Sequence, residues 1–262
     1  MPLGVRYYTD PACSASWAVE PALRKLMMEF GTDLSITYVM GGLARSYEGD
    51  LSPMILSWLD VSDRSRMPID PRLWSEGPIH STYPACMAVK AAAEQGPEAA
   101  GRYLRAVREG LMCFRRKLDT KEALVEEARA AGLDVQRFRV DLDSNAIVEA
   151  FAADLEETRS IEGLVLPSVR FEGEAGVEWL FGETGYEEWR AAAVAAGAAA
   201  SGSAPPEPLA AVERFGRVAD VEVAALCELP IPRASAELWR LATEWKLRPV
   251  RVLTGTLWEL AS

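Results

Sequence analysis

A strand, a helix and a second strand follow one another within the first 40 residues, and this order constrains the fold most. Residues 4–8 alternate in side-chain polarity, and an apolar helical period runs from about Cys13 to Phe30, where Gly31 ends it. Leu34–Met40 (LSITYVM) is rich in β-branched and aromatic residues, as strands are. Because two strands connected through a helix pair in parallel, the start of the chain predicts a βαβ unit.

Helical patterns dominate the next part of the chain, from residue 52 to about residue 159. Asp119 and Glu122 form a capping-box pattern before a helix that Gly132 ends, and another helix begins at about Asn145. Four prolines interrupt residues 51–79, so we predict a loop with one short helix there.

Strand patterns return in the segments 164–171 (LVLPSVRF) and 177–181 (VEWLF), and residues 172–176 between them predict a hairpin turn. A further helix is predicted from residue 186 to about residue 197. The order β-α-β, helical block, β-β-α is that of an α/β thioredoxin fold with a helical insertion at about 52–159. We assign residues 1–198 to this domain.

The segment 199–208 (AASGSAPPEP) has the composition of a linker. Residues 209–262 predict three short helices and a hairpin, an order that resembles a small winged-helix-like α+β module. This module contains seven Lys+Arg and seven Asp+Glu, and the whole chain has a formal net charge of −11. DNA binding needs a positive face, so we expect a packing or protein-contact role and no nucleic-acid partner.

The sequence lacks the residues or motifs that several common classes of functional site require. No two of the four cysteines lie within four residues of each other, and His80 is the single histidine, so no metal site is expected. Neither GxGxxG nor GxxxxGK[ST] occurs, which argues against nucleotide cofactors. The chain has neither an apolar run long enough for a membrane span nor a signal-peptide pattern. We therefore expect a cytoplasmic protein without a membrane partner, its cysteines free thiols.

Cys13 stands at the end of the first predicted strand and the start of the first predicted helix. Helix N–H groups and the helix dipole stabilise an anion there, so we expect a lowered thiol pKa. The thiolate is the attacking species in thiol–disulfide exchange. Cys113 lies in the apolar run 111–114 (LMCF) and Cys227 on an apolar helix face, and we interpret both as core residues.

The segment 10–17 reads DPACSASW, and Pro21 follows in the same helix. With the segment 166–171 (LPSVRF), it resembles the active site of DsbA-like thioredoxin-fold proteins, whose usual motif is Cys-x-x-Cys. The resemblance implies a proline, commonly cis, that faces the reactive sulfur, and Pro167 fits that role. The residues it places at the site are Cys13 and Ser16 as catalytic, and Asp10, Pro11, Trp17, Leu166 and Pro167 around the substrate.

Residues 74–93 and 132–134 are most similar to a cytoplasmic branch that includes Spx-adaptor-type proteins. FrnE-like and 2-hydroxychromene-2-carboxylate isomerase-like proteins share the architecture. The resemblance covers roughly residues 5–195 and does not include the C-terminal module. It implies that the segment around Cys86 lies near the active-site helix.

Ser16 occupies the position of the resolving cysteine, and a serine cannot expel the product of a mixed disulfide. Three functions stay open: a monothiol disulfide oxidoreductase acting on protein or small-molecule disulfides, a non-enzymatic protein-binding adaptor, and a glutathione-dependent isomerase or transferase. Glutathione or another small thiol is the expected co-substrate of an enzyme, with no bound cofactor. Cys86 is a candidate resolving thiol. His80 is either an accessory proton donor or a solvated loop residue.

Overall fold

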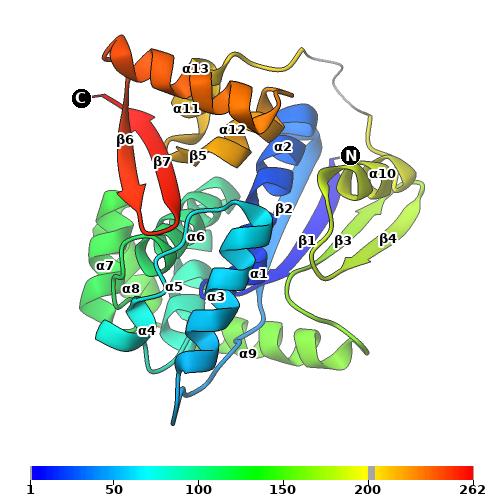
Figure 1. Cartoon of the computed structure of the whole chain (residues 1–262). Helices are drawn as coiled ribbons and strands as arrows, with labels where there is room; N and C mark the ends of the chain where they lie inside the picture. Colours follow the sequence, from blue (N-terminus) through cyan, green and yellow to red (C-terminus); the bar gives the residue numbers. More distant parts are fainter. Residues whose placement is uncertain (1, 200–203, 262) are drawn as a thin grey trace.

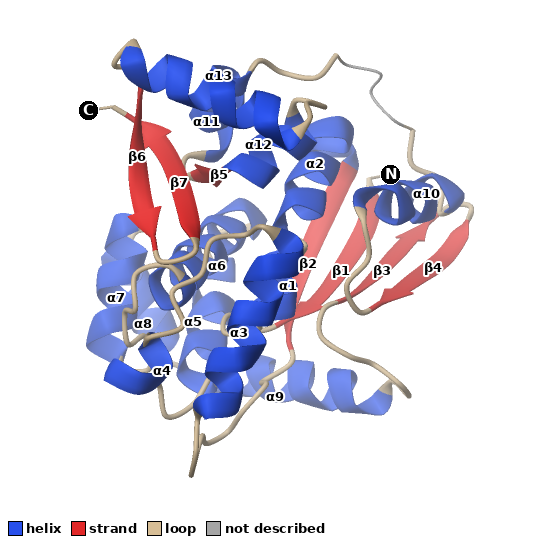
Figure 2. Cartoon of the chain, viewed as in Figure 1, coloured by secondary structure: helices blue, strands red, loops and turns tan. Residues whose placement is uncertain are grey.

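The computed structural model describes residues 2–199 and 204–261 (Figures 1 and 2). Its central sheet has the order β2-β1-β3-β4, in which β1 runs parallel to β2 and antiparallel to β3. The predicted βαβ start and the thioredoxin-type order of elements are confirmed. The four strands are β1 (Leu3–Thr9), β2 (Leu34–Met40), β3 (Ser168–Gly173) and β4 (Gly176–Phe181).

Helices cover both faces of this sheet. On one face the Tyr7 ring packs edge-on against Trp189 of α10 (Tyr186–Ala195), with the ring centroids 5.8 Å apart. On the other face the Tyr8 hydroxyl donates to Glu157 Oε1 at 2.6 Å. Glu157 belongs to α9 (Asn145–Ser160), the last helix of the inserted block. The other helices of this block are α3 (Ser52–Ser65), α4 (Leu73–Glu76), α5 (Tyr83–Ala93), α6 (Pro97–Met112), α7 (Lys121–Ala130) and α8 (Val135–Leu142).

The predicted single helix from Cys13 to Phe30 is wrong, because the chain forms α1 (Ser14–Ala18) and α2 (Glu20–Phe30) instead, with a 3₁₀ turn η1 (Gly31–Asp33) after α2. The helices break at Val19. Pro21 explains the break, since a proline ring clashes with the carbonyl group four residues earlier and lacks an N–H.

The prediction for residues 51–79 is also wrong. Four turns of regular helix, α3, occupy its first half. Pro53 lies in the first turn of α3, where a proline is tolerated because no N–H is needed. The C-cap residue of the helix is Arg66, whose φ is 61°, and Pro68 follows two residues later. The prolines therefore flank the helix and do not interrupt it.

Two predicted boundaries need correction. Thr120 caps α7 through its Oγ1, which accepts the Ala123 N–H at 3.4 Å, so the predicted capping residue Asp119 is wrong. Strand β3 begins at Ser168, four residues later than predicted. Pro167 precedes it and has no N–H to donate to the sheet.

The C-terminal unit, residues 208–261, contains the predicted three helices and hairpin, together with a short strand that was not predicted. Pro208 is the first residue of its first helix, so the predicted linker ends too late, and residues 200–203 of that linker lie outside the described residues. The winged-helix and domain assignments stay predictions. The elements are α11 (Pro208–Phe215), β5 (Val218–Ala219), α12 (Asp220–Leu226), α13 (Ile231–Thr243), β6 (Leu247–Val252) and β7 (Gly255–Leu260), with sheet order β5-β7-β6.

A buried cluster of charged side chains joins the C-terminal unit to α2 and α6. At its centre the guanidinium of Arg105 donates to both carboxylate oxygens of Glu222, at 2.8 and 3.0 Å, and to Glu20 at 3.2 Å. Glu222 on α12 is fully buried and also pairs with Arg24 at 3.2 Å. Four arginines and four glutamates balance in charge: Arg24, Arg105, Arg108, Arg217, Glu20, Glu109, Glu222 and Glu259.

Glu222→Ala should lower the free energy of unfolding by about 3–5 kcal/mol, because Arg105 and Arg24 each lose one buried carboxylate partner and the cluster is left with an excess positive charge. Urea denaturation followed by circular dichroism measures this change. Glu244→Ala is the matched control, since Glu244 pairs with Arg240 and Lys246 at the surface of the same unit. Equal stability of the two variants would contradict a structural role of the buried cluster.

Candidate functional site

Cys13 lies where β1 leads into α1 (Figure 1). It is the N-cap residue of α1, and its Sγ accepts the Ser16 N–H at 3.4 Å. Its own N–H donates to the Asp10 carbonyl at 3.1 Å. Only 5% of the residue is exposed to solvent. The strand-to-helix junction thus presents the sulfur as predicted, but almost wholly below the surface.

The loop before β3 reaches the same sulfur. Cys13 Sγ lies 3.7 Å from the Leu166 carbonyl oxygen, and the Leu166–Pro167 peptide bond is cis. Two segments more than 150 residues apart in the chain therefore meet, as the resemblance implied.

Burial raises the pKa of the Cys13 thiol above its ordinary value, and the Asp10 carboxylate adds to this rise. Hydrogen bonds from Ser16 and the charge of Arg108 oppose it without cancelling it. The expected lowered pKa is therefore wrong. Sequence spacing predicted the helix start but not the burial of the sulfur, and removal of water from the sulfur is the largest influence on its pKa.

Three residues predicted to surround the substrate are buried. Asp10 positions the neighbouring backbone, because its carboxylate accepts the N–H groups of Ala12 at 2.8 Å and Leu43 at 2.7 Å. Trp17 donates from Nε1 to the Pro68 carbonyl at 3.0 Å and has no exposed surface. Neither of these two side chains nor Pro11 lines the groove beside Cys13.

Cys86 and His80 lie in different surroundings. Cys86 is fully buried on α5, and its Sγ donates to Asp10 Oδ2 at 3.3 Å. Burial and the Asp10 carboxylate raise its pKa well above the ordinary value. The His80 side chain is 79% exposed, pairs with Asp119 and does not line the groove, so the structure favours the solvated alternative. A resolving role for Cys86 stays a prediction.

A groove of about 380 Å³ opens beside Cys13, and sequence reasoning missed most of its walls. The Trp74 ring contacts Tyr47 and Trp58 edge-on, with centroids 4.8 and 5.2 Å apart. Trp58 and Trp74 were the only aromatic residues in a segment predicted to be mainly loop, and this was the available signal. The lining residues are Ala12, Cys13, Ser14, Ala15, Leu43, Tyr47, Met54, Ser57, Trp58 and Trp74.

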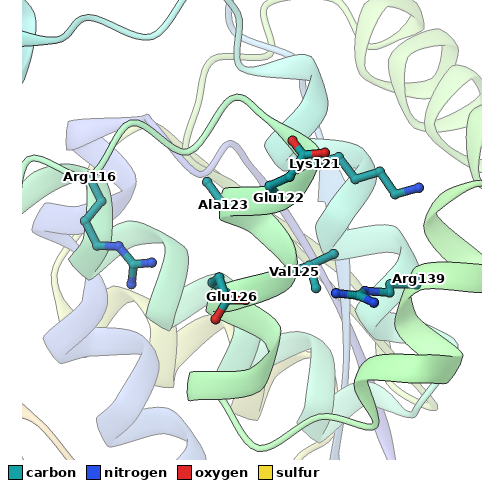
Figure 3. Close-up of a pocket in the computed structure, with 7 residues that line it drawn as sticks. All are labelled: Arg116, Lys121, Glu122, Ala123, Val125, Glu126 and Arg139. Atoms are coloured by element: carbon teal, nitrogen blue, oxygen red, sulfur yellow. The ribbon is translucent and has the colours of Figure 1, made fainter.

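A second hollow, of about 440 Å³, lies over α7 and α8 (Figure 3). Two of its cations are already paired, Arg116 with Glu127 and Lys121 with Asp143. Its lining contains no thiol, so we place the candidate site at the Cys13 groove. Within residues 2–199 and 204–261, no three His, Cys, Asp or Glu side chains gather to hold a metal, and no helix is long and apolar enough to cross a membrane.

A family model described as thioredoxin matches residues 7–181. The chain belongs to the thioredoxin family. It is similar over 98% of its length to the ClpXP adapter protein SpxH of Halalkalibacterium halodurans, with 31% identity and 88% of that relative covered. The SpxH of Bacillus subtilis is 27% identical, with 100% of this chain and 90% of the relative covered. The resemblance to Spx-adaptor-type proteins is confirmed and extends through the C-terminal unit, contrary to the expectation that this unit lies outside it.

Solved structures share the fold. A protein from Nitrosomonas europaea described as a protein disulfide isomerase superposes with a TM-score of 0.66 at 20% identity, covering 73% of this chain and 95% of that chain. The cytosolic disulfide reductase DsbM of Pseudomonas aeruginosa gives a TM-score of 0.59 at 16% identity, covering 73% and 93%. At these identities the match concerns architecture alone, so thiol chemistry, a small-thiol co-substrate and a cytoplasmic location stay predictions.

Alkylation of Cys13 by iodoacetamide should increase with pH and reach its midpoint above that of an ordinary cysteine. The thiolate is the reacting species, and burial moves its formation to higher pH. Peptide mass spectrometry of the native protein gives the rate at each pH, and a cysteine-containing peptide is the reference. A midpoint below that of the peptide would contradict the role of burial.

Proposed function

We propose that the protein is an adapter that holds a protein client for the ClpXP protease. Similarity to proteins named ClpXP adapter over 98% of this chain carries the proposal. An Spx-type protein is the first client to test, given the adaptor type that the sequence resembles. The negative charge of the chain agrees with a protein partner and not a nucleic acid.

The chemistry of the site supports binding over catalysis. Ser16 stands in place of the second cysteine and is fully buried. Because a hydroxyl cannot form a disulfide, Ser16 cannot complete a disulfide cycle. Burial also raises the pKa of Cys13, which reduces the thiolate available near neutral pH. The fold keeps the architecture of an oxidoreductase and lacks the thiol pair that would release a product.

The groove beside Cys13 offers an apolar binding surface. Leu43 lines it and is 50% exposed. An exposed apolar side chain in an aromatic-lined groove is typical of a protein contact. We therefore assign client binding to this groove.

Leu43→Glu should weaken client binding about tenfold or more, because a charge replaces an apolar contact that the client buries. Val140→Glu is the control, since Val140 is 71% exposed on α8 and does not line the groove. Isothermal titration with the Spx-type protein gives the affinities, and degradation by purified ClpXP gives the functional outcome. The adapter proposal is wrong if the unmodified protein leaves the degradation rate unchanged. Equal affinities of the two variants would instead place client binding outside the groove.

A monothiol disulfide oxidoreductase is the second candidate function, favoured by the Leu166 carbonyl 3.7 Å from Cys13 Sγ. In this reaction the Cys13 thiolate attacks a substrate disulfide, one S–S bond forms as another breaks, and the leaving thiolate takes up a proton. A small external thiol such as glutathione then attacks the substrate sulfur of the mixed disulfide and releases the Cys13 thiol. Cys86 would instead attack the Cys13 sulfur, which releases the substrate thiol and leaves a Cys13–Cys86 disulfide.

Cys13→Ser should reduce thiol–disulfide exchange with a disulfide or glutathione mixed-disulfide substrate to the level measured without protein. The hydroxyl is not a nucleophile towards disulfides, whereas the fold is retained. Cys227→Ser serves as the control, because Cys227 lies in the core of the C-terminal unit. Full activity of Cys13→Ser would exclude the oxidoreductase at this site.

A further inference from the structure

A chain of hydroxyl groups connects Cys13 to a buried arginine. Arg108 on α6 donates from Nη2 to Thr9 Oγ1, and Thr9 in turn donates to Ser16 Oγ at 2.8 Å. Ser16 donates its N–H to the sulfur of Cys13 at 3.4 Å, and its side chain lowers the pKa of that thiol. Arg108, Thr9 and Ser16 have no exposed surface, so water does not compete with these bonds. Thr9 accepts from the guanidinium and donates to Ser16, so these bonds point from Arg108 towards the residue that contacts the sulfur.

The same arginine ends the buried ion cluster. Glu20 accepts from Arg108 Nη1 and also from Arg105. Arg105 donates twice to Glu222 on α12 of the C-terminal unit. Glu222 and Glu20 thus share Arg105, and Glu20 is itself shared between Arg105 and Arg108.

We propose that Arg108 acts through the hydroxyls of Thr9 and Ser16 to control the reactivity of the Cys13 thiol, and that the docked C-terminal unit sets this control through Glu222. Ser16 thereby has a role of its own, because a cysteine at this position would be a poorer hydrogen-bond donor to the sulfur. A partner that displaces the C-terminal unit would change the reactivity of Cys13. The proposal goes beyond adapter activity, and the thiol is assayed without client or protease.

Several other titratable groups lie around Cys13. Asp10 in the same loop repels a thiolate, and the charge of Arg108 stabilises one. Tyr7 on β1 and Tyr47 after β2 interact with Cys13 and are neutral near pH 7, since burial raises the pKa of each. Cys86 on α5 is held by Asp10 and is neutral as well. Among these groups Arg108 supplies the positive charge.

Thr9→Val tests the connection between Arg108 and Cys13. It keeps the side-chain volume at position 9 and leaves Arg108 and Cys13 in place, but it removes the hydroxyl between them. We expect the alkylation midpoint of Cys13 to rise by about one pH unit, and alkylation below the midpoint to slow about tenfold. Ser16→Ala should give at least as large a rise. Tyr103→Phe is the control, since it removes a buried hydroxyl that donates to the Leu124 carbonyl away from the site. Partial unfolding would lower the midpoint towards that of a free thiol, so it cannot imitate the expected rise.

Glu222→Gln tests the control by the C-terminal unit. A neutral glutamine at this position attracts Arg105 less, so Arg105 pairs more strongly with Glu20 and Glu20 neutralises Arg108 less. The alkylation midpoint of Cys13 should therefore fall, and alkylation should become about two- to threefold faster. In the Thr9→Val background this acceleration should shrink to less than half, because the connecting hydroxyl is absent. Circular dichroism confirms that each variant is folded. An unchanged profile of Thr9→Val would overturn the proposal, and a full acceleration in the double variant would overturn the route through Thr9.

Discussion

The buried ion cluster between α2, α6 and the C-terminal unit is the interaction on which the arrangement of the whole chain depends. A single unpaired charge of this cluster would cost free energy inside a protein. Pairing of all the charges offsets the desolvation of the buried side chains. Arg105 illustrates this, because it contacts Glu20, Glu109 and Glu222 from three different elements. Charge pairing of this kind is directional, and it fixes how the C-terminal unit sits against α2 and α6.

Periodicity and turn residues predicted the order of the elements well. Strand β2 has the predicted bounds, α9 begins at Asn145, and the cis bond at Pro167 lies where the resemblance implied it. These features depend on local patterns or on a short motif. The errors fall where a local pattern has two meanings: prolines were taken to interrupt residues 51–79, but Pro53 begins a helix. The sequence alone does not say which side of a proline is helical.

The environment of the site was less predictable, because burial depends on residues far away in the chain. Cys13 lies at a helix start, as predicted, yet burial raises its pKa, and its sulfur contacts the Leu166 loop from a distant part of the chain. Trp17 looked like a pocket residue beside the thiol, but Pro68 accepts its N–H and the Arg105 guanidinium covers its ring at 4.2 Å. The charges of the cluster are scattered through residues 20–259, and no spacing rule brings them together.

Trp17 and Ser16 also show how binding and thiol chemistry can share one architecture. The side of α1 that faces inward bonds to the charge cluster and the hydroxyl chain, whereas the start of α1 and α3 form the apolar groove. A client in the groove would touch Cys13 directly, and the C-terminal unit contacts the same helix from within through Arg105. Ser16 in place of the second cysteine removes the thiol that would resolve a mixed disulfide within the motif, but it leaves the sulfur between these two surfaces. In such a site the reactivity of Cys13 would depend on whether both surfaces are occupied. This dependence is compatible with a protein that only binds its client, because binding does not require an unreactive thiol.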